Sequence, residues 1–118
     1  MKYKKEYDEF IETFQKERDF FKCHEILEDI WVAETGCNTR KHVSINLLLV
    51  SVGLLHWQRK NFNGALKVLG DSLNNYENVK SEINAIGIDA EKLEKSILEN
   101  LEKIRLKKEY SEIYLPML

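Results

Sequence analysis

The chain is 118 residues long, which leaves room for one domain that spans residues 1–118. Hydrophobic residues make up 43% of it and charged residues 32%, a composition typical of globular and not of disordered proteins. One proline and five glycines are too few for a β fold with many turns. The 18 basic and 20 acidic residues are spread along the chain, so the sequence lacks the concentrated basic surface of a nucleic-acid-binding protein.

The sequence does not indicate a membrane segment or export. Its most apolar stretch, residues 43–57, is shorter than the roughly 20 apolar residues that a membrane helix needs, and polar residues interrupt it. The first nine residues are charged and lack the apolar run of a signal peptide. We therefore expect a soluble, cytoplasmic protein with no membrane association.

The two cysteines, Cys23 and Cys37, match no spacing typical of zinc or redox sites. In the cytoplasm both thiols are expected to stay reduced. Cys23 lies in the middle of a predicted helix, and we expect it to be buried as a small apolar side chain.

Apolar residues recur at helical spacing in five segments, and no segment of useful length alternates with the period of a strand. The first four predicted helices span about residues 4–16, 19–34, 40–60 and 63–78. The fifth begins after residues 86–88, which form a loop, and its apolar stripe extends to Ile104. Residues that favour helix ends support these boundaries: Asp19 and Asp89 as N-caps, Asn38 or Thr39 as the N-cap of the third helix, and Gly36 as a C-cap.

The third predicted helix is apolar on every side from Ile45 to Trp57, so it belongs in the middle of a domain. A short break at residues 61–64 makes the third and fourth helices an antiparallel hairpin. This hairpin resembles one tetratricopeptide unit, but the chain has no 34-residue self-similarity and is not a repeat array. We expect the apolar tail, residues 110–118, to dock on the core rather than mediate association. The predicted fold is an all-α, compact bundle of about five helices.

Polar residues interrupt an apolar helix face in one place, residues 20–31. On a helical wheel that starts at Phe20, His24 and Glu28 fall inside the aromatic face and Glu25 lies nearer its edge. Titratable groups that point into a core must be paired or hydrogen-bonded. We therefore expect His24 and Glu28 to meet His56 of the third helix in an internal polar cluster, with Trp31 as its apolar wall.

Three kinds of chemistry fit this cluster. A structural network of imidazole and carboxylate groups is the first, and we favour it; a small-molecule site and a metal site are the alternatives. The zincin pattern His-Glu-x-x-His is incomplete because Glu28 stands where the second His would be, although His56 would complete a three-ligand set. The di-iron pattern Glu-x-x-His is absent, so we assign no metal and no cofactor.

The same residues resemble a known family, the small prokaryotic helical proteins of domain of unknown function 309. The resemblance covers about residues 10–80. It rests on an aromatic pair followed by His-Glu-x-x-Glu-x-x-Trp and, in support, on a His that precedes a Gly-Asn-like turn and Gly-Ala; the matching residues are Phe20, Phe21, His24, Glu25, Glu28 and Trp31, and then His56, Asn61, Gly64 and Ala65. Relatives often carry Gln-Gly-Leu-Ile-Gln where this chain has residues 45–49, Ile-Asn-Leu-Leu-Leu. Both glutamine positions are apolar here, which favours the structural interpretation.

Such membership implies a fold and not an activity. We expect a structural or protein-interaction role, with a protein partner or a homodimer and without nucleic acid. The alternative is a small-molecule or metal-binding protein, for example a hydrolase, in which His24, Glu28 and His56 are ligands or acid–base groups and Glu25 and Trp31 line the site. We favour the hypothesis of an enzyme less than that of a structural or interaction role.

Overall fold

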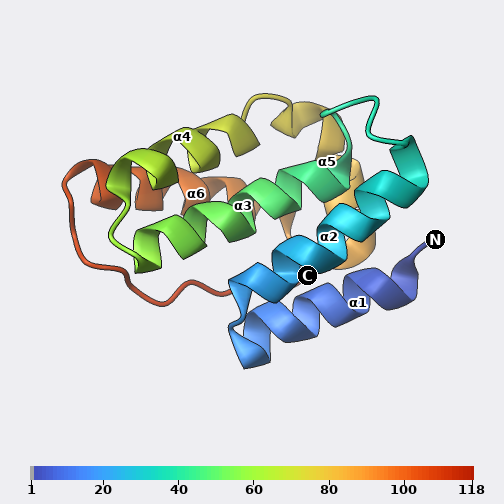
Figure 1. The fold of residues 1–118 in the computed structure, drawn as a ribbon, viewed down its shortest axis with the longest axis horizontal. Helices are drawn as coiled ribbons and strands as arrows, with labels where there is room; N and C mark the ends of the chain where they lie inside the picture. Colours follow the sequence, from blue (N-terminus) through green and yellow to red (C-terminus); the bar gives the residue numbers. More distant parts are fainter. Residues whose placement is uncertain (1) are drawn as a thin grey trace.

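The structure is a computed structural model that describes residues 2–118, and it confirms the all-α fold class (Figure 1). Within these residues the chain forms six α-helices: α1 (Lys4–Glu12), α2 (Phe20–Thr35), α3 (Val43–Gln58), α4 (Phe62–Ser72), α5 (Tyr76–Ile86) and α6 (Ala90–Arg105). A π-helical turn, η1 (Thr13–Glu17), continues α1, and residues 106–118 form an extended tail after α6. No helix in the described part of the chain has the length and apolar character needed to cross a membrane.

The middle of the bundle is α3, as the all-round apolar sequence predicts. It lies between α2 and α4, and a tight connection after Gln58 turns the chain back into α4 (Figure 1). Gly53 allows this hairpin to close, because a Cβ at that position would lie 2.5 Å from the side chain of Leu69. The central helix and its antiparallel hairpin with α4 are therefore confirmed.

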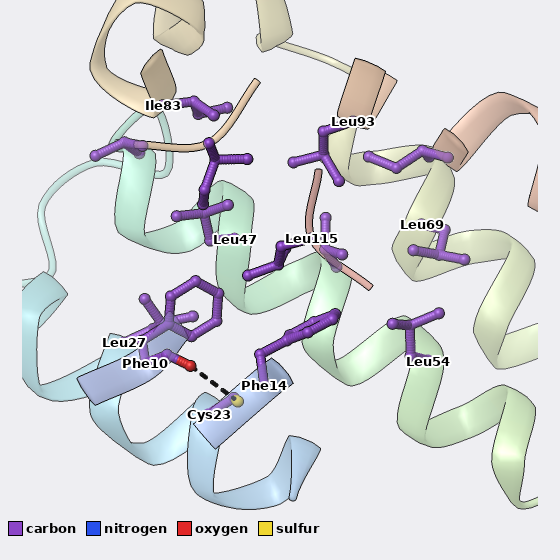
Figure 2. Packing of buried hydrophobic residues seen from close by; sticks show 14 of the residues in the cluster. Phe10, Phe14, Cys23, Leu27, Leu47, Leu54, Leu69, Ile83, Leu93 and Leu115 are labelled. Carbon is purple, nitrogen blue, oxygen red and sulfur yellow. Dashed lines mark hydrogen bonds between the residues drawn. The ribbon is translucent and has the colours of Figure 1, made fainter. Parts of the chain in front are cut away.

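One continuous core joins the first helix to the tail. Figure 2 shows Phe10 and Phe14 from the start of the chain packed near Leu115 from its end, with side chains of α2, α3 and α4 around them. Cys23 is fully buried in this core, with its thiol 3.9 Å from the carbonyl oxygen of Phe10 (Figure 2). The expectation of a buried, free Cys23 is confirmed.

The prediction of one continuous helix over residues 63–78 is wrong, because a turn divides this segment between α4 and α5. Leu73, Asn74 and Asn75 form the turn between them, and Asn is a residue type that favours turns. A contact from another helix fixes where α4 ends: the buried Asn46 amide donates a hydrogen bond to the Ser72 carbonyl, which has no partner in its own helix. Residues 79–85, assigned to no helix from the sequence, complete α5.

The capping predictions are confirmed at three of four helix ends. Asp19 accepts the Lys22 N–H at 3.0 Å, Asp89 accepts the Lys92 N–H at 3.1 Å, and Gly36 ends α2 in the left-handed conformation. The prediction of Asn38 or Thr39 as a cap is wrong, because α3 begins only at Val43. Its cap is His42, whose Nδ1 accepts the Ser44 N–H at 3.2 Å.

The tail docks on the bundle, as expected from its apolar sequence. Gln15 in η1 holds it with two hydrogen bonds: its amide donates to the Leu115 carbonyl at 2.8 Å, and its carbonyl accepts the Leu115 N–H at 2.7 Å. The Arg18 guanidinium pairs with Glu112 at 2.6 Å and lies 4.1 Å from the centre of the Tyr114 ring. These contacts hold the Leu115 side chain in the core, where it is 3% exposed.

Replacing Gln15 tests whether this clamp stabilises the fold. Gln15→Ala leaves the N–H and C=O groups of Leu115 without partners, and we expect the free energy of unfolding to fall by about 1–3 kcal/mol. Chemical denaturation of both proteins measures the change. Gln58→Ala is the matched control, because Gln58 is exposed at the end of α3. Equal stabilities of the two variants would contradict the clamp.

The two thiols are expected to differ in reactivity. Burial is the main reason that the pKa of Cys23 rises to about 12, whereas Cys37 is exposed. Because the thiolate is the reactive form, one thiol per chain should react with a disulfide reagent in the native protein and two in denaturant. The Cys37→Ser variant should show no fast-reacting thiol, and a fast second thiol in the native protein would contradict the packing.

Candidate functional site

The two faces of α2 have different surroundings. Its inner face consists of Phe20, Cys23, Leu27 and Ile30, and all four side chains are buried in the core. Phe20 packs on Phe14, with ring centres 4.9 Å apart. The polar residues of the sequence motif therefore lie on the other side of the helix or at its border. This outer face is the candidate functional surface.

His24 and Glu28 meet on this outer face, as their spacing of one helical turn predicts. The imidazole Nε2 lies 3.0 Å from a carboxylate oxygen of Glu28. The Glu28 side chain is 50% exposed and that of His24 is 29% exposed, so the pair is at the surface and not in the core. The other ring nitrogen of His24, Nδ1, is shielded from solvent and has no hydrogen-bond partner within residues 2–118.

His56 does not join this pair, and the expected internal cluster of three residues is wrong. The ring of His56 lies 3.1 Å from the Asn61 amide, at the turn between α3 and α4. Asn61 is also the N-cap of α4, so His56 supports the hairpin connection. Among residues 2–118 there is no group of three His, Cys, Asp or Glu side chains arranged to hold a metal ion.

Trp31 has a structural contact. Its indole N–H donates to the carbonyl oxygen of Thr39 at 2.6 Å, so Trp31 ties the connection between α2 and α3 to the end of α2. Thr35 closes the same end of the helix by donating to the Trp31 carbonyl at 2.7 Å. Trp31 is half-buried and serves as a packing anchor, not as the wall of a polar cluster.

The outer face carries two further acidic side chains, Glu25 and Asp29. Both are exposed, and neither forms an ion pair within the described part of the chain, residues 2–118. Together with Phe21, His24 and Glu28 they line a shallow hollow of about 210 Å³. The helix α2 thus places three carboxylates and one imidazole around an open depression.

The sequence did not single out Phe21 or Asp29 as site residues. Phe21 is 53% exposed although it belongs to an aromatic pair, and its ring centre lies 5.8 Å from that of His24. The helical period indicates that Phe21 points away from the core. Phe20 and Phe21 differ by about 100° around the axis, so the two rings cannot both face the core defined by Cys23 and Leu27.

The outer face of α2 is predominantly acidic. Three of the four acidic residues of α2, Glu25, Glu28 and Asp29, line the hollow on this face, and the helix carries one basic residue. The basic one, Lys22, already pairs with Glu17 at 3.4 Å. An acidic surface that includes an exposed aromatic ring is suited to bind cationic side chains, by ion pairing and by contact with the ring.

Two comparisons with known proteins find similar sequences. The family model described as domain of unknown function (DUF309) matches residues 7–68, more than half of the chain, and this range includes α2 and α3. The chain is similar to "Uncharacterized protein YpuF" of Bacillus subtilis (strain 168), with 30% identity over 115 residues. This match covers 98% of the chain but 66% of the relative, so the chain spans slightly less than two thirds of that protein's length. No solved structure matches the chain. The chain belongs to the family described as domain of unknown function (DUF309).

Proposed function

We propose that residues 1–118 act as one domain that binds another protein, and that the outer face of α2 is its docking surface. The observation that carries the proposal is the exposure of Glu25 and Asp29, together with their lack of ion-pair partners within residues 2–118. Both carboxylates lie beside the exposed ring of Phe21. Charges of this kind contribute little to folding and are available to a partner.

Charge complementarity favours a protein segment rich in Arg or Lys as the partner. The acidic excess of α2 favours such a segment and disfavours nucleic acid. It also disfavours a homodimer through this face, because in a symmetric dimer the same patch meets itself and like charges would be brought together. Leu115 of the tail is buried in the core, so this side chain is not available to a partner.

We assign different roles to the residues of the motif. Glu25 and Glu28 belong to the docking surface together with His24, which orients the Glu28 carboxylate through their 3.0 Å contact. Trp31 holds the helix end and lies outside the surface, as does His56. The two free thiols are consistent with a reducing compartment, and we propose the cytoplasm.

Removing charge from α2 tests the proposal. The probe is a short amphipathic helical peptide that carries Arg and Leu on one face, and calorimetry measures its affinity at low salt. We expect the Glu25→Gln/Asp29→Asn double variant to bind about tenfold more weakly, because exposed ion pairs contribute about 0.5–1 kcal/mol each. A peptide with Glu in place of Arg should not bind.

The matched control is Glu9→Gln/Glu99→Gln. It removes the same total charge from exposed carboxylates of α1 and α6, away from the outer face of α2. Its affinity for the Arg peptide should stay close to that of the unmodified protein. If both double variants lose the same affinity for the Arg peptide, only the net charge of the protein matters and the docking surface is contradicted. The absence of saturable binding to the unmodified protein would also contradict it.

A further inference from the structure

A second hollow lies at the other end of α2, away from the proposed docking surface. It has a volume of about 290 Å³ and is formed where the beginnings of α1 and α3 meet the ends of α2 and α5. Its volume is at the lower limit of small-molecule sites. Its lining comes from four parts of the chain, and the residues that matter here are Tyr3, Tyr7, Glu34, His42, Glu82 and Ile86.

The inward-facing polar group of this hollow is the phenol of Tyr7. Tyr7 is 4% exposed, it lines the hollow, and its hydroxyl forms no hydrogen bond within residues 2–118. The side chain is buried, but its hydroxyl keeps access to the hollow and has no protein partner there, so it is available to bond to a ligand. Burial is the largest cause of the raised pKa of Tyr7, followed by the negative charges of Glu34 and Glu82. Both carboxylates therefore act on the space that the hydroxyl faces.

The two carboxylates differ in their present partners. Glu82 accepts a hydrogen bond from the Ser81 hydroxyl at 3.3 Å and has no ion pair inside the described residues. Glu34 has an ammonium nearby: Lys2 Nζ lies 3.7 Å from its carboxylate and 5.5 Å from the centre of the Tyr3 ring. The Lys2 side chain is 74% exposed, so this contact is weak and can be displaced.

We propose that this hollow binds a small primary amine. The ammonium group would lie between Glu34, Glu82 and the Tyr7 hydroxyl, where it has three acceptors, and a short hydrocarbon body would contact Val43 and Ile86. Lys2 occupies the rim with the same chemistry and competes with the ligand. His42 contributes a wall and not an acceptor, because its Nδ1 caps α3 and the neutral ring then carries its proton on Nε2.

Titration of the full chain with n-butylamine, followed by backbone amide NMR, tests this proposal. We expect saturable shifts of the amides around Glu34, Val43 and Ile86 at constant salt, and none with n-butanol or butyrate. Glu34→Gln and Glu82→Gln should each weaken binding about fivefold, as should Tyr7→Phe, which removes only the hydroxyl. Lys2→Ala should strengthen binding, because it removes the internal competitor.

Glu99→Gln on α6 is the matched control and should bind as the unmodified protein does. The NMR spectra also report whether each variant is folded. Tighter binding of butyrate than of the amine, weaker binding in Lys2→Ala, or equal effects of Glu82→Gln and Glu99→Gln would overturn the proposal. So would tighter binding of N-acetyl-lysine-N-methylamide, which would point to a protein lysine instead of a free amine. Peptide binding to the outer face of α2 is measured separately, and either result leaves the other intact.

Discussion

The need to bury α3 on all sides constrains the rest of the structure. This helix carries apolar side chains around its whole circumference, and ten of its sixteen residues are buried. Helices with one apolar stripe must therefore surround it, and α2 and α4 lie along its sides (Figure 1). The core that results is completed by Leu115 of the tail, and the polar clamps at Gln15 and Arg18 keep the tail in place.

This arrangement determines what α2 can offer to other molecules. A helix that packs along a central partner has one face in the core and one outside, and the inner face of α2 is filled by Phe20, Cys23, Leu27 and Ile30. The remaining positions of the motif cannot also be internal. His24 and Glu28 therefore pair at the surface, where their contact orients a carboxylate instead of holding two helices together. The polar motif lies at the surface and not in the core, and for this reason we propose a role for it in recognition.

The fold could be predicted from the sequence to a large extent, because helical spacing and caps are local signals. Asp19, Gly36 and Asp89 mark true helix ends for the physical reasons that apply to isolated helices. The division of residues 62–86 into α4 and α5 could not be predicted in this way. Asn74 and Asn75 favour a turn, but the apolar stripe continues past them to Tyr76 and indicates one helix. The hydrogen bond from Asn46 to Ser72, 26 positions apart, leaves no periodic trace in the sequence.

The site was predicted less well, and the reason is geometrical. A wheel centred on Phe20 and Phe21 places His24 and Glu28 in the apolar face. Cys23, Leu27 and Ile30 move the centre of the buried face by about 90° away from these two residues. Phe21 and Glu28 then fall outside, and His24 lies at the border. His56 was assigned to the cluster because it shares a stripe with core residues, although the last turn of α3 directs it to Asn61. The hollow around Tyr7 joins four separate segments, which no single helical wheel can represent.

The outward orientation of the α2 carboxylates is the claim on which the proposed function rests, and chemical labelling measures it directly. Coupling of glycine ethyl ester with a carbodiimide, followed by mass spectrometry, gives the labelling rate of each carboxylate in the native protein. The structure predicts that Glu25, Glu28 and Asp29 are labelled about as fast as the exposed Glu9 and Glu99. Protection of all three until the protein unfolds would place them inside the bundle and would contradict the account.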